Sequence, residues 1–294
     1  AEGFANYEWR WRGATELTSR GFVQPQWRGE DIAGGTIFLH AEQGYGDSIQ
    51  MLRYLPLVKA CGARVVLEMP NSLMPLLGPH AGNVVVLNRG TPLPPFDLHC
   101  PLMSLPLAFG TTLDTVPAEA PYLFAPVRAS VRARLPQEGL RVGLAWSGKP
   151  SHKNDHNRSI ALERLAPLIS LPGTSFVSLQ REYRDADLRA LADLPIARLD
   201  DVIRDFADTA AAIDGLDLVI AVDTAVAHLA GSLGKPLWLL LSHIQDWRWL
   251  CEREDSPWYP TARLFRQGPD GAWDPVIARA TDELTRYALS RRGA

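Results

Sequence analysis

The fold class of this chain follows from residues 216–241, which read LDLVIAVDTAVAHLAGSLGKPLWLLL. The largely apolar residues 216–222 are typical of a strand that is covered on both faces in a parallel sheet. Thr224 is a suitable first cap for a helix over residues 225–233, and the glycine and proline that follow end this helix. The stretch therefore predicts a strand, a tight turn and a helix, which is the repeating unit of an α/β protein.

The turn between this strand and this helix is a candidate ligand site. Asp223 and Thr224 stand where the strand ends, and open α/β sheets bind their ligands at that edge. The amino end of a helix offers free N–H groups and a positive dipole end to an anion. His228, one turn further on, lies on the same helix face. The alternative is an ordinary capped turn with a buried, hydrogen-bonded histidine.

Composition and charge restrict the class of protein. The 294 residues allow two domains or one large one, and 46% hydrophobic with 21% charged residues is typical of a soluble globular protein. A net charge of −3 without a basic stripe argues against nucleic-acid binding. No stretch is long enough to span a membrane, and three scattered cysteines form neither a disulfide framework nor a metal site. We therefore expect a cytoplasmic protein.

Two series of alternating strands and helices predict two Rossmann-like domains with parallel sheets facing across a cleft. We expect strands at residues 36–41, 63–69, 83–87, 97–100, 140–146, 174–179, 196–199, 216–222, 236–241 and 262–265, and helices at 48–60, 71–77, 161–169, 185–192, 225–233 and 274–291. The expected units are an N-terminal helical segment (1–35), a first domain (36–125), a second domain (126–275) and a final helix (276–294). One expected position for this final helix is against the first domain.

A glycine-containing turn follows the first expected strand. Residues 42–47 read EQGYGD, and Gly44 and Gly46 permit a tight turn and close approach of a ligand. Asp47 falls at the start of the next helix, facing the cleft. Its functional interpretation is a general base presented to a hydroxyl, and its structural alternative is a helix cap.

A dinucleotide site is one alternative for this turn. The fingerprint G-x-G-x-x-G is not met, because Ile49 stands three residues after Gly46. Glu68, at the end of the second strand, does resemble the acidic residue that holds a ribose in dehydrogenases. An NAD-dependent oxidoreductase is therefore disfavoured but kept as an alternative.

A polar loop, residues 147–159, reads SGKPSHKNDHNRS and separates a strand from a helix. Its hydroxyls, amides and the cations Lys149, Lys153 and Arg158 suit a phosphate-binding loop, although a solvated loop is the alternative. His152 and His156 stand four residues apart without further ligands, so we expect no metal site. Residues 246–249 (DWRW) and 256–260 (SPWYP) are interpreted as aromatic packing beneath a long loop, and the alternative is a wall of the cleft near a nucleobase or sugar.

These motifs together resemble the heptosyltransferase-type glycosyltransferases of family nine. The resemblance rests on Gly46-Asp47, on Arg158 followed by ALERL at 161–165, and on DTA and HLA at 223–225 and 228–230. It extends over most of the chain from Thr36 onward. Residues 7–12 (YEWRWR) are similar to the segment that joins tetratricopeptide repeats to such domains in bacterial repeat proteins.

The resemblance implies a GT-B architecture and an inverting, metal-independent transfer of a sugar from a nucleoside-diphosphate sugar. It implies that Asp47 deprotonates the acceptor and that the N–H groups of Thr224 and Ala225 hold the diphosphate. It further implies that Asp223 contacts the sugar and that Arg158 stabilises the leaving group. The family more often has Lys at the position of Arg158 and Gly at that of Ala225.

The resulting expectation is an enzyme with Asp47 as the catalytic residue and with no metal and no cofactor besides the donor substrate. The expected nucleotide-sugar-binding residues are Gly44, Gly46, Ser147, Lys149, Lys153, Arg158, Gln180, Asp223, Thr224, Ala225 and His228. Expected partners are the nucleotide sugar, a glycan or protein acceptor, and proteins bound through adjoining repeats. A non-catalytic interaction module on a tetratricopeptide scaffold and a nucleotide-sugar epimerase are the alternatives.

Overall fold

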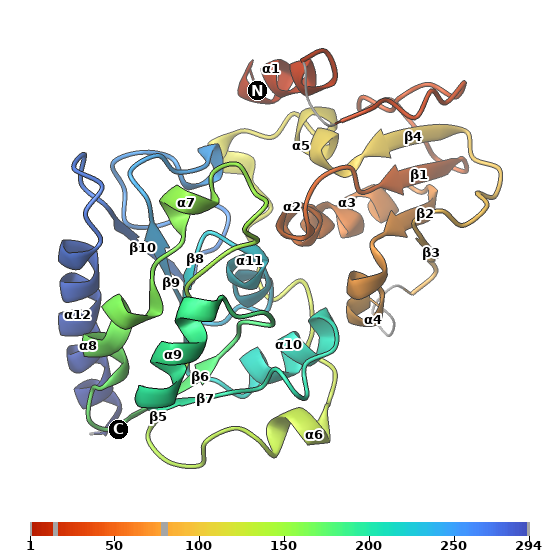
Figure 1. Ribbon diagram of the computed structural model, residues 1–294. Coiled ribbons are helices and arrows are strands. Elements are labelled where there is room, and N and C mark those ends of the chain that lie inside the picture. The colour runs from red at the N-terminus through yellow and green to blue at the C-terminus, as the bar shows by residue number, and fades with distance from the viewer. Residues whose placement is uncertain (1, 14–16, 78–81, 293–294) are drawn as a thin grey trace.

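Two parallel sheets form the frame of the computed structural model, which describes residues 2–13, 17–77 and 82–292 (Figure 1). The N-terminal sheet has the order β3-β2-β1-β4, with β1 at Thr36–His40, β2 at Arg64–Met69, β3 at Val85–Asn88 and β4 at Leu98–Pro101. The C-terminal sheet has the order β10-β9-β8-β5-β6-β7, with β5 at Leu140–Ala145, β6 at Thr174–Ser178, β7 at Ile196–Ala197, β8 at Leu218–Val222, β9 at Leu237–Leu241 and β10 at Ala262–Arg266. Each strand pairing within these sheets is parallel, as the alternating pattern predicts.

Helices follow most strands and cover the sheets. In the N-terminal half these are α2 (Tyr45–Met51), α3 (Leu55–Ala60), α4 (Met74–Leu77) and α5 (Leu105–Ala108), with 3-10 turns at Leu52–Tyr54, Asn71–Leu73, Leu102–Ser104 and Leu113–Thr115. The C-terminal half contains α6 (Ala129–Arg132), α7 (Asp155–Arg158), η7 (Leu162–Leu165), α8 (Ala166–Ile169), α9 (Asp185–Asp193), α10 (Phe206–Asp214), α11 (Ala225–Ser232), η8 (Trp247–Trp249) and α12 (Asp274–Arg292). The central strands β8 and β9 are buried along their whole length, which explains their uninterrupted apolar sequence.

The two halves meet where α2 packs on α11. Gly46 makes this contact possible, because a Cβ atom there would lie 2.6 Å from Cδ2 of His228 and 3.5 Å from Cα of Ala225. Arg53 also crosses the boundary and donates to the carbonyl oxygen of Trp258 at 2.6 Å. One hydrophobic core runs from the N-terminal sheet through α11 to one face of the C-terminal sheet. The glycine turn and the segment that defines the fold are therefore in direct contact.

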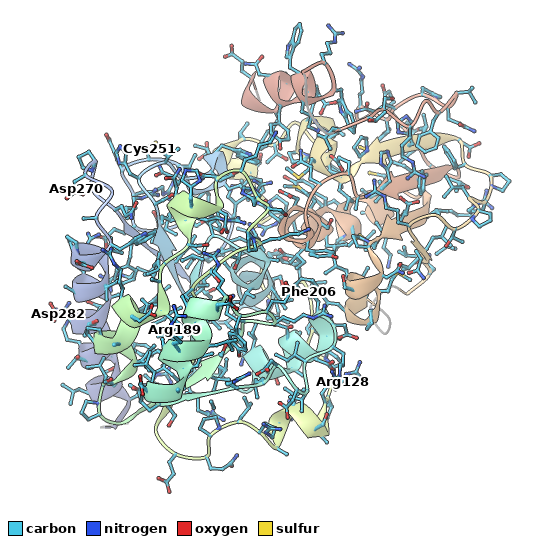
Figure 2. The ribbon with its side chains drawn as sticks, viewed as in Figure 1. Arg128, Arg189, Phe206, Cys251, Asp270 and Asp282 are labelled. Atoms are coloured by element: carbon cyan, nitrogen blue, oxygen red, sulfur yellow. The ribbon has the colours of Figure 1, made fainter. Side chains whose placement is uncertain are left out.

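Helix α10 was not expected from the sequence. Asp205 caps it by accepting hydrogen bonds from the N–H groups of Ala207 and Asp208 at 2.8 and 3.0 Å. Its first residue, Phe206, faces the N-terminal half (Figure 2), where the Tyr45 ring lies 5.1 Å away between centroids. The helix therefore adds a further contact between the halves.

The predicted final helix forms as α12 and packs against α8 and β10 of the C-terminal half (Figure 1). This position differs from a return to the first domain. A second difference concerns the predicted helix over 48–60, which begins earlier, at Tyr45, and is divided into α2, a 3-10 turn and α3. Gly44 is the residue before the first turn, so Asp47 lies inside the helix start and not before it.

The N-terminal segment consists of α1 (Glu2–Tyr7) and the 3-10 turn η1 (Glu8–Trp11). Phe4 packs edge-on against Trp247 and Trp258 of the C-terminal half, at 5.6 and 6.4 Å between ring centroids. The hydroxyl of Tyr7 donates to Oε1 of Gln43 in the N-terminal half at 3.0 Å. The segment thus packs on both halves. Within the described ranges, no helix is long and apolar enough for a membrane crossing.

Candidate functional site

The candidate site lies between the carboxyl ends of the two sheets. Asp47 follows β1 through the glycine turn, and Asp223 and Thr224 follow β8. The α2–α11 contact brings these two turns together, as the positions of Gly46 and His228 require. Residues predicted separately in the two halves of the sequence therefore meet at one place.

Both oxygens of the Asp47 carboxylate have partners. Oδ2 accepts a hydrogen bond from the N–H of Gly44 at 2.8 Å. Asp47 therefore does not occupy the cap position, which is Gly44, but it satisfies the cap's N–H from the third residue of the helix. Oδ1 forms an ion pair with Nη2 of Arg248, a residue of η8 in the C-terminal half. The Asp47 side chain remains 23% exposed, so its outer face is open to a ligand. Capping and a chemical role are compatible at this carboxylate, since each oxygen has a second lone pair.

Arg248 is a member of the site that the sequence analysis missed. Arg248 is 5% exposed. Its Nε donates to Oε1 of Gln50 at 2.5 Å, and its Nη1 donates to Oδ1 of Asp246 at 2.7 Å. Burial acts to lower its pKa, but the charges of Asp47 and Asp246 prevail and raise it. The signal in the sequence is an arginine between two tryptophans, a pattern that predicts packing or a wall of the cleft but does not identify Asp47 as the partner of the arginine.

Asp223 lies at the end of β8 in a poorly hydrated position. Burial raises its pKa to about 6, and the charge of Asp246 adds to the rise, against Arg248 and Arg158. The backbone carbonyl of Asp223 accepts a hydrogen bond from Nη1 of Arg158 at 2.8 Å. The structure therefore places both predicted residues, Asp223 and Arg158, in contact.

His228 is buried beneath the site and neutral. Burial, together with the nearby arginine cations, lowers its pKa far below the usual range. Its Nδ1 shares a hydrogen bond of 2.8 Å with the hydroxyl of Tyr259, and Nε2 is 3.9 Å from Oδ1 of Asp223. Its ring stacks on Trp249 at 5.5 Å between centroids. These contacts support the alternative of a hydrogen-bonded buried histidine.

The amino end of α11 presents unpaired polar groups. Thr224 caps the helix, and its buried Oγ1 has no hydrogen-bond partner among the described residues. The first N–H groups of a helix have no carbonyl partner within it; here these are the N–H groups of Ala225 and Val226, whereas the N–H of Ala227 donates to the Thr224 carbonyl oxygen at 3.0 Å. This end of α11 can therefore donate hydrogen bonds to an anion.

The polar loop borders the same place. A hollow of about 630 Å³ is lined by Pro150, Ser151, His152, Lys153, Asp155, His156 and Arg184. The acidic side chains of Asp155, Asp47 and Asp246 act to raise the pKa of His152, although burial and Arg158 lower it overall. Arg158 of this loop donates to the Asp223 carbonyl oxygen at 2.8 Å, so the loop borders the turn before α11.

The remaining predicted residues are placed as follows. Gln180 Nε2 donates to Oγ of Ser147 at 2.8 Å, so these two residues bind each other at the ends of β6 and β5. Lys153 lines the hollow, whereas Lys149 is exposed in the same loop. In the described part of the chain, no group of three or more His, Cys, Asp or Glu side chains is arranged to hold a metal ion.

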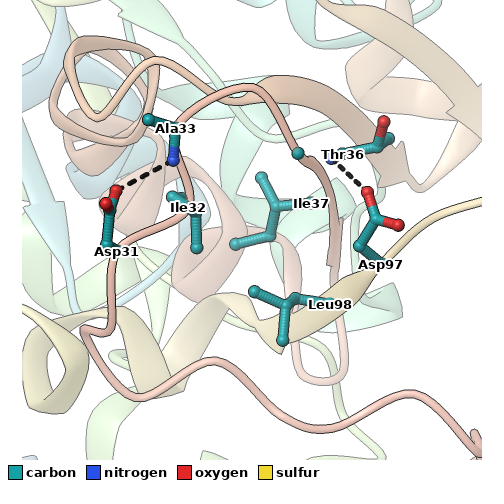
Figure 3. Close-up of a pocket in the computed structure, with 8 residues that line it drawn as sticks. Asp31, Ile32, Ala33, Thr36, Ile37, Asp97 and Leu98 are labelled. Atoms are coloured by element: carbon teal, nitrogen blue, oxygen red, sulfur yellow. Dashed lines mark hydrogen bonds between the residues drawn. The ribbon is translucent and has the colours of Figure 1, made fainter.

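Two other features lie outside this site. Glu68 is 1% exposed and binds Nη1 of Arg20 at 2.6 Å, which leaves it poorly placed to hold a ribose. A small hollow of about 190 Å³ lies at the amino ends of β1 and β4 (Figure 3). Its carboxylates, Asp31 and Asp97, accept hydrogen bonds from backbone N–H groups at 3.0 and 2.7 Å. This hollow is at the sheet edge opposite the candidate site.

Comparison with known proteins supports the fold. No family model matches the chain. Protein FlbA of Caulobacter vibrioides is 28% identical over 320 residues, which cover 98% of this chain and 53% of FlbA. The chain thus spans about half the length of this curated relative.

Solved structures give the architecture. The E. coli ADP-heptose lps heptosyltransferase II aligns with a TM-score of 0.60 at 14% identity, covering 87% of this chain and 99% of that structure. A glycosyl transferase family 9 structure from Veillonella parvula aligns with a TM-score of 0.59 at 11% identity, covering 90% and 98%. The predicted α/β fold of GT-B type, with two parallel sheets, is therefore confirmed.

Proposed function

We propose that this chain is an inverting, metal-independent glycosyltransferase that moves a sugar from a nucleoside-diphosphate sugar to a hydroxyl group of a glycan or protein. One observation carries the proposal. Gly46, the neighbour of Asp47 in the N-terminal half, packs against Ala225 and His228 of α11 in the C-terminal half, where Arg158 binds the Asp223 carbonyl. A carboxylate close to an anion-binding helix end is the pair of groups that this transfer needs.

The donor binds through the C-terminal half in this proposal. The N–H groups at the start of α11 and the unpaired Oγ1 of Thr224 hold the diphosphate. Arg158 lies beside them and provides a fixed positive charge, and Lys153 adds a second from the hollow in the polar loop. Asp223 faces the sugar hydroxyls. The heptosyltransferase II neighbour is named for ADP-heptose, so an adenine nucleotide is the first donor to test.

The chemical step uses Asp47 as the general base. The acceptor oxygen forms a bond to the anomeric carbon as Asp47 takes its proton, and the bond from that carbon to the diphosphate oxygen breaks. The electron pair leaves with the nucleoside diphosphate, whose charge Arg158 and the helix end stabilise. Attack opposite the leaving group inverts the anomeric centre.

A second candidate is a non-catalytic module that binds a nucleotide sugar. It is favoured by the Asp47 carboxylate, since both of its oxygens already have partners in Gly44 and Arg248. Association with proteins through neighbouring repeats belongs to this candidate as well as to the enzyme. We propose a cytoplasmic location for either, because Cys61, Cys100 and Cys251 are free thiols.

Calorimetry with ADP, UDP and GDP, in the presence of EDTA, tests donor binding. We expect one of them to bind with a micromolar to millimolar dissociation constant, and absence of binding by all three would refute the proposal. Arg158→Met should weaken this affinity by about tenfold or more, because a charge-assisted hydrogen bond is lost. Arg164→Met is the matched control, since Arg164 is half exposed and pairs with Asp274 on α12.

Transfer is tested with a panel of nucleoside-diphosphate sugars by release of the nucleoside diphosphate. Asp47→Asn should keep nucleotide affinity within about threefold and lower transfer by about 100-fold or more, which is the usual contribution of a general base. Equal transfer rates of the wild type and Asp47→Asn would show that Asp47 is not the general base. Nucleotide binding without turnover in the wild type would identify the non-catalytic module.

A further inference from the structure

Arg248 connects the two halves at the position of the proposed base. It belongs to η8 of the C-terminal half, yet it donates to Asp47 and to Gln50, both of α2 in the N-terminal half. Arg248 also donates to the carboxylate of Asp246, the residue that caps η8. The function proposed above does not use this arginine.

The guanidinium group is held in one orientation. Its Nε donates to Gln50, its Nη1 to Asp246, and its Nη2 to Asp47 and to Sδ of Met103 at 3.7 Å, and the residue is 5% exposed. Arginine stays protonated in proteins, so Asp47 faces a permanent cation, and the buried guanidinium group is not free to turn out into water. The Gly44 N–H, on the other carboxylate oxygen, leaves Asp47 fixed from two sides.

The same turn also contacts the donor side of the site. Trp249, the neighbour of Arg248, stacks on His228, which lies beneath Asp223. Trp247, the neighbour on the other side, packs against Phe4 of the N-terminal segment. A displacement of η8 would therefore move the partner of Asp47 and the ring that supports α11 together.

We infer that Arg248 is a positioning residue that orients the Asp47 carboxylate toward the acceptor hydroxyl from the opposite half of the molecule. The inference rests on the proposed glycosyl transfer and adds to it a residue that acts through Asp47. In this arrangement the base has its working geometry only while the two halves are in contact. Donor affinity does not depend on Arg248, because the diphosphate groups are assigned to α11 and Arg158.

Arg53 offers a matched control. It is also buried, at 3% exposure, and also joins the halves, through the carbonyl oxygen of Trp258, while a second donor binds the hydroxyl of Tyr122. Its Nε donates to the carbonyl oxygen of Gln50, so it approaches α2 without using the Asp47 carboxylate. A loss of packing alone should affect the two arginines alike.

The experiment compares Arg248→Met, Arg248→Lys and Arg53→Met by kcat, KM, nucleotide Kd and Tm. For Arg248→Met we expect kcat to fall about 100-fold, as for a reacting group misplaced by about 1 Å, with Kd changed less than about threefold. Arg248→Lys should recover part of kcat, because it keeps the charge and loses the fork geometry. Arg53→Met should lower Tm and leave kcat within about threefold. Equal losses of kcat, or full activity of Arg248→Met, would overturn the inference.

A double-mutant cycle makes the test independent of turnover. Asp47→Asn, Arg248→Met and the double variant are compared by urea unfolding, and we expect the double variant to be more stable than the sum of the single effects predicts. Additive effects would overturn the pairing on which the inference depends. A wild type that transfers no sugar would instead refute the proposed function, so the two failures are distinct. If Arg248→Met does not fold, Arg248→Lys and the uncharged double variant complete the comparison.

Discussion

Replacing Asp223 by asparagine is expected to stabilise the folded protein at pH 8. Burial raises the pKa of the Asp223 carboxyl from 3.8 to about 6. A group whose pKa is higher in the folded state binds more protons there than in the unfolded state between these two values. Stability therefore falls as the pH rises from about 4 to about 6, and it stays low above that range.

The magnitude follows from the same two values. A rise from 3.8 to about 6 corresponds to a penalty of about 3 kcal/mol for the ionised carboxylate. The side chain is 20% exposed, so water relieves part of this penalty and about 1–3 kcal/mol is the expected range. Asparagine has nearly the same shape without the charge. Asp223→Asn should gain this amount at pH 8 and lose the gain at about pH 4.

Asp217, just before the same strand β8, is the matched control. Its carboxylate accepts hydrogen bonds from the backbone N–H, Nε and Nη2 of Arg141 at 2.9, 3.1 and 3.0 Å. Burial acts to raise its pKa, but these bonds prevail and lower it. The stability that it contributes is present above an unfolded pKa of about 3.8 and is lost as the pH falls below that value. Asp217→Asn should therefore destabilise the protein at pH 8.

Urea unfolding of the wild type and the two variants at pH 4.5, 6 and 8 provides the measurement. The reasoning requires opposite signs for the two substitutions at pH 8 and a gain for Asp223→Asn that shrinks toward acid pH. A gain of the same size at pH 4.5 and pH 8 would refute it. So would a loss of stability in Asp223→Asn at pH 8.

Three further outcomes are expected. Gly46→Ala should lower the free energy of unfolding in urea by about 1–2 kcal/mol. The added methyl group would overpack against the His228 ring, and this cost exceeds the gain of up to about 1 kcal/mol in helix propensity. Unchanged stability would contradict the close α2–α11 contact. Tyr259→Phe should cost about 1–3 kcal/mol in the same assay, since the buried Nδ1 of His228 loses its partner at 2.8 Å; a neutral result would argue that water replaces the hydroxyl. EDTA should leave nucleotide affinity unchanged by calorimetry, because Arg158 and the α11 end supply the positive charge, and a loss of affinity that Mg²⁺ restores would show a metal requirement.

The sequence predicted the fold well where local patterns determine it. Apolar runs bounded by glycine, proline and capping residues identified the buried strands, and short turns after them identified the carboxyl edge of each sheet. Helix α10 shows the limit of this approach. Its residues 207–213 are all buried, Asp208 and Thr209 included, so the burial of this helix depends on tertiary packing that its local sequence does not specify.

The site shows a different limit. Asp223 and Thr224 were found because they follow β8 directly, and Asp47 was found because it lies at the helix start to which the glycine turn after β1 leads. Arg248 was not found, because it pairs with Asp47 across 201 residues of sequence and between two halves. The two tryptophans beside it indicated burial, and only tertiary packing specifies which carboxylate a buried arginine meets.

The distribution of destabilising groups favours a ligand site over a structural module. Asp223 is ionised at a cost at one end of β8, whereas Asp217 at the other end is fully hydrogen-bonded. Beside Asp223, Oγ1 of Thr224 and Nε of Arg158 are buried without hydrogen-bond partners in the described part of the chain. A fold that serves only as a scaffold gains stability when such groups are replaced by apolar ones. A diphosphate that accepts hydrogen bonds from Thr224 and Arg158 would convert this cost into affinity, so ADP should raise the Tm of the wild type more than that of Thr224→Val.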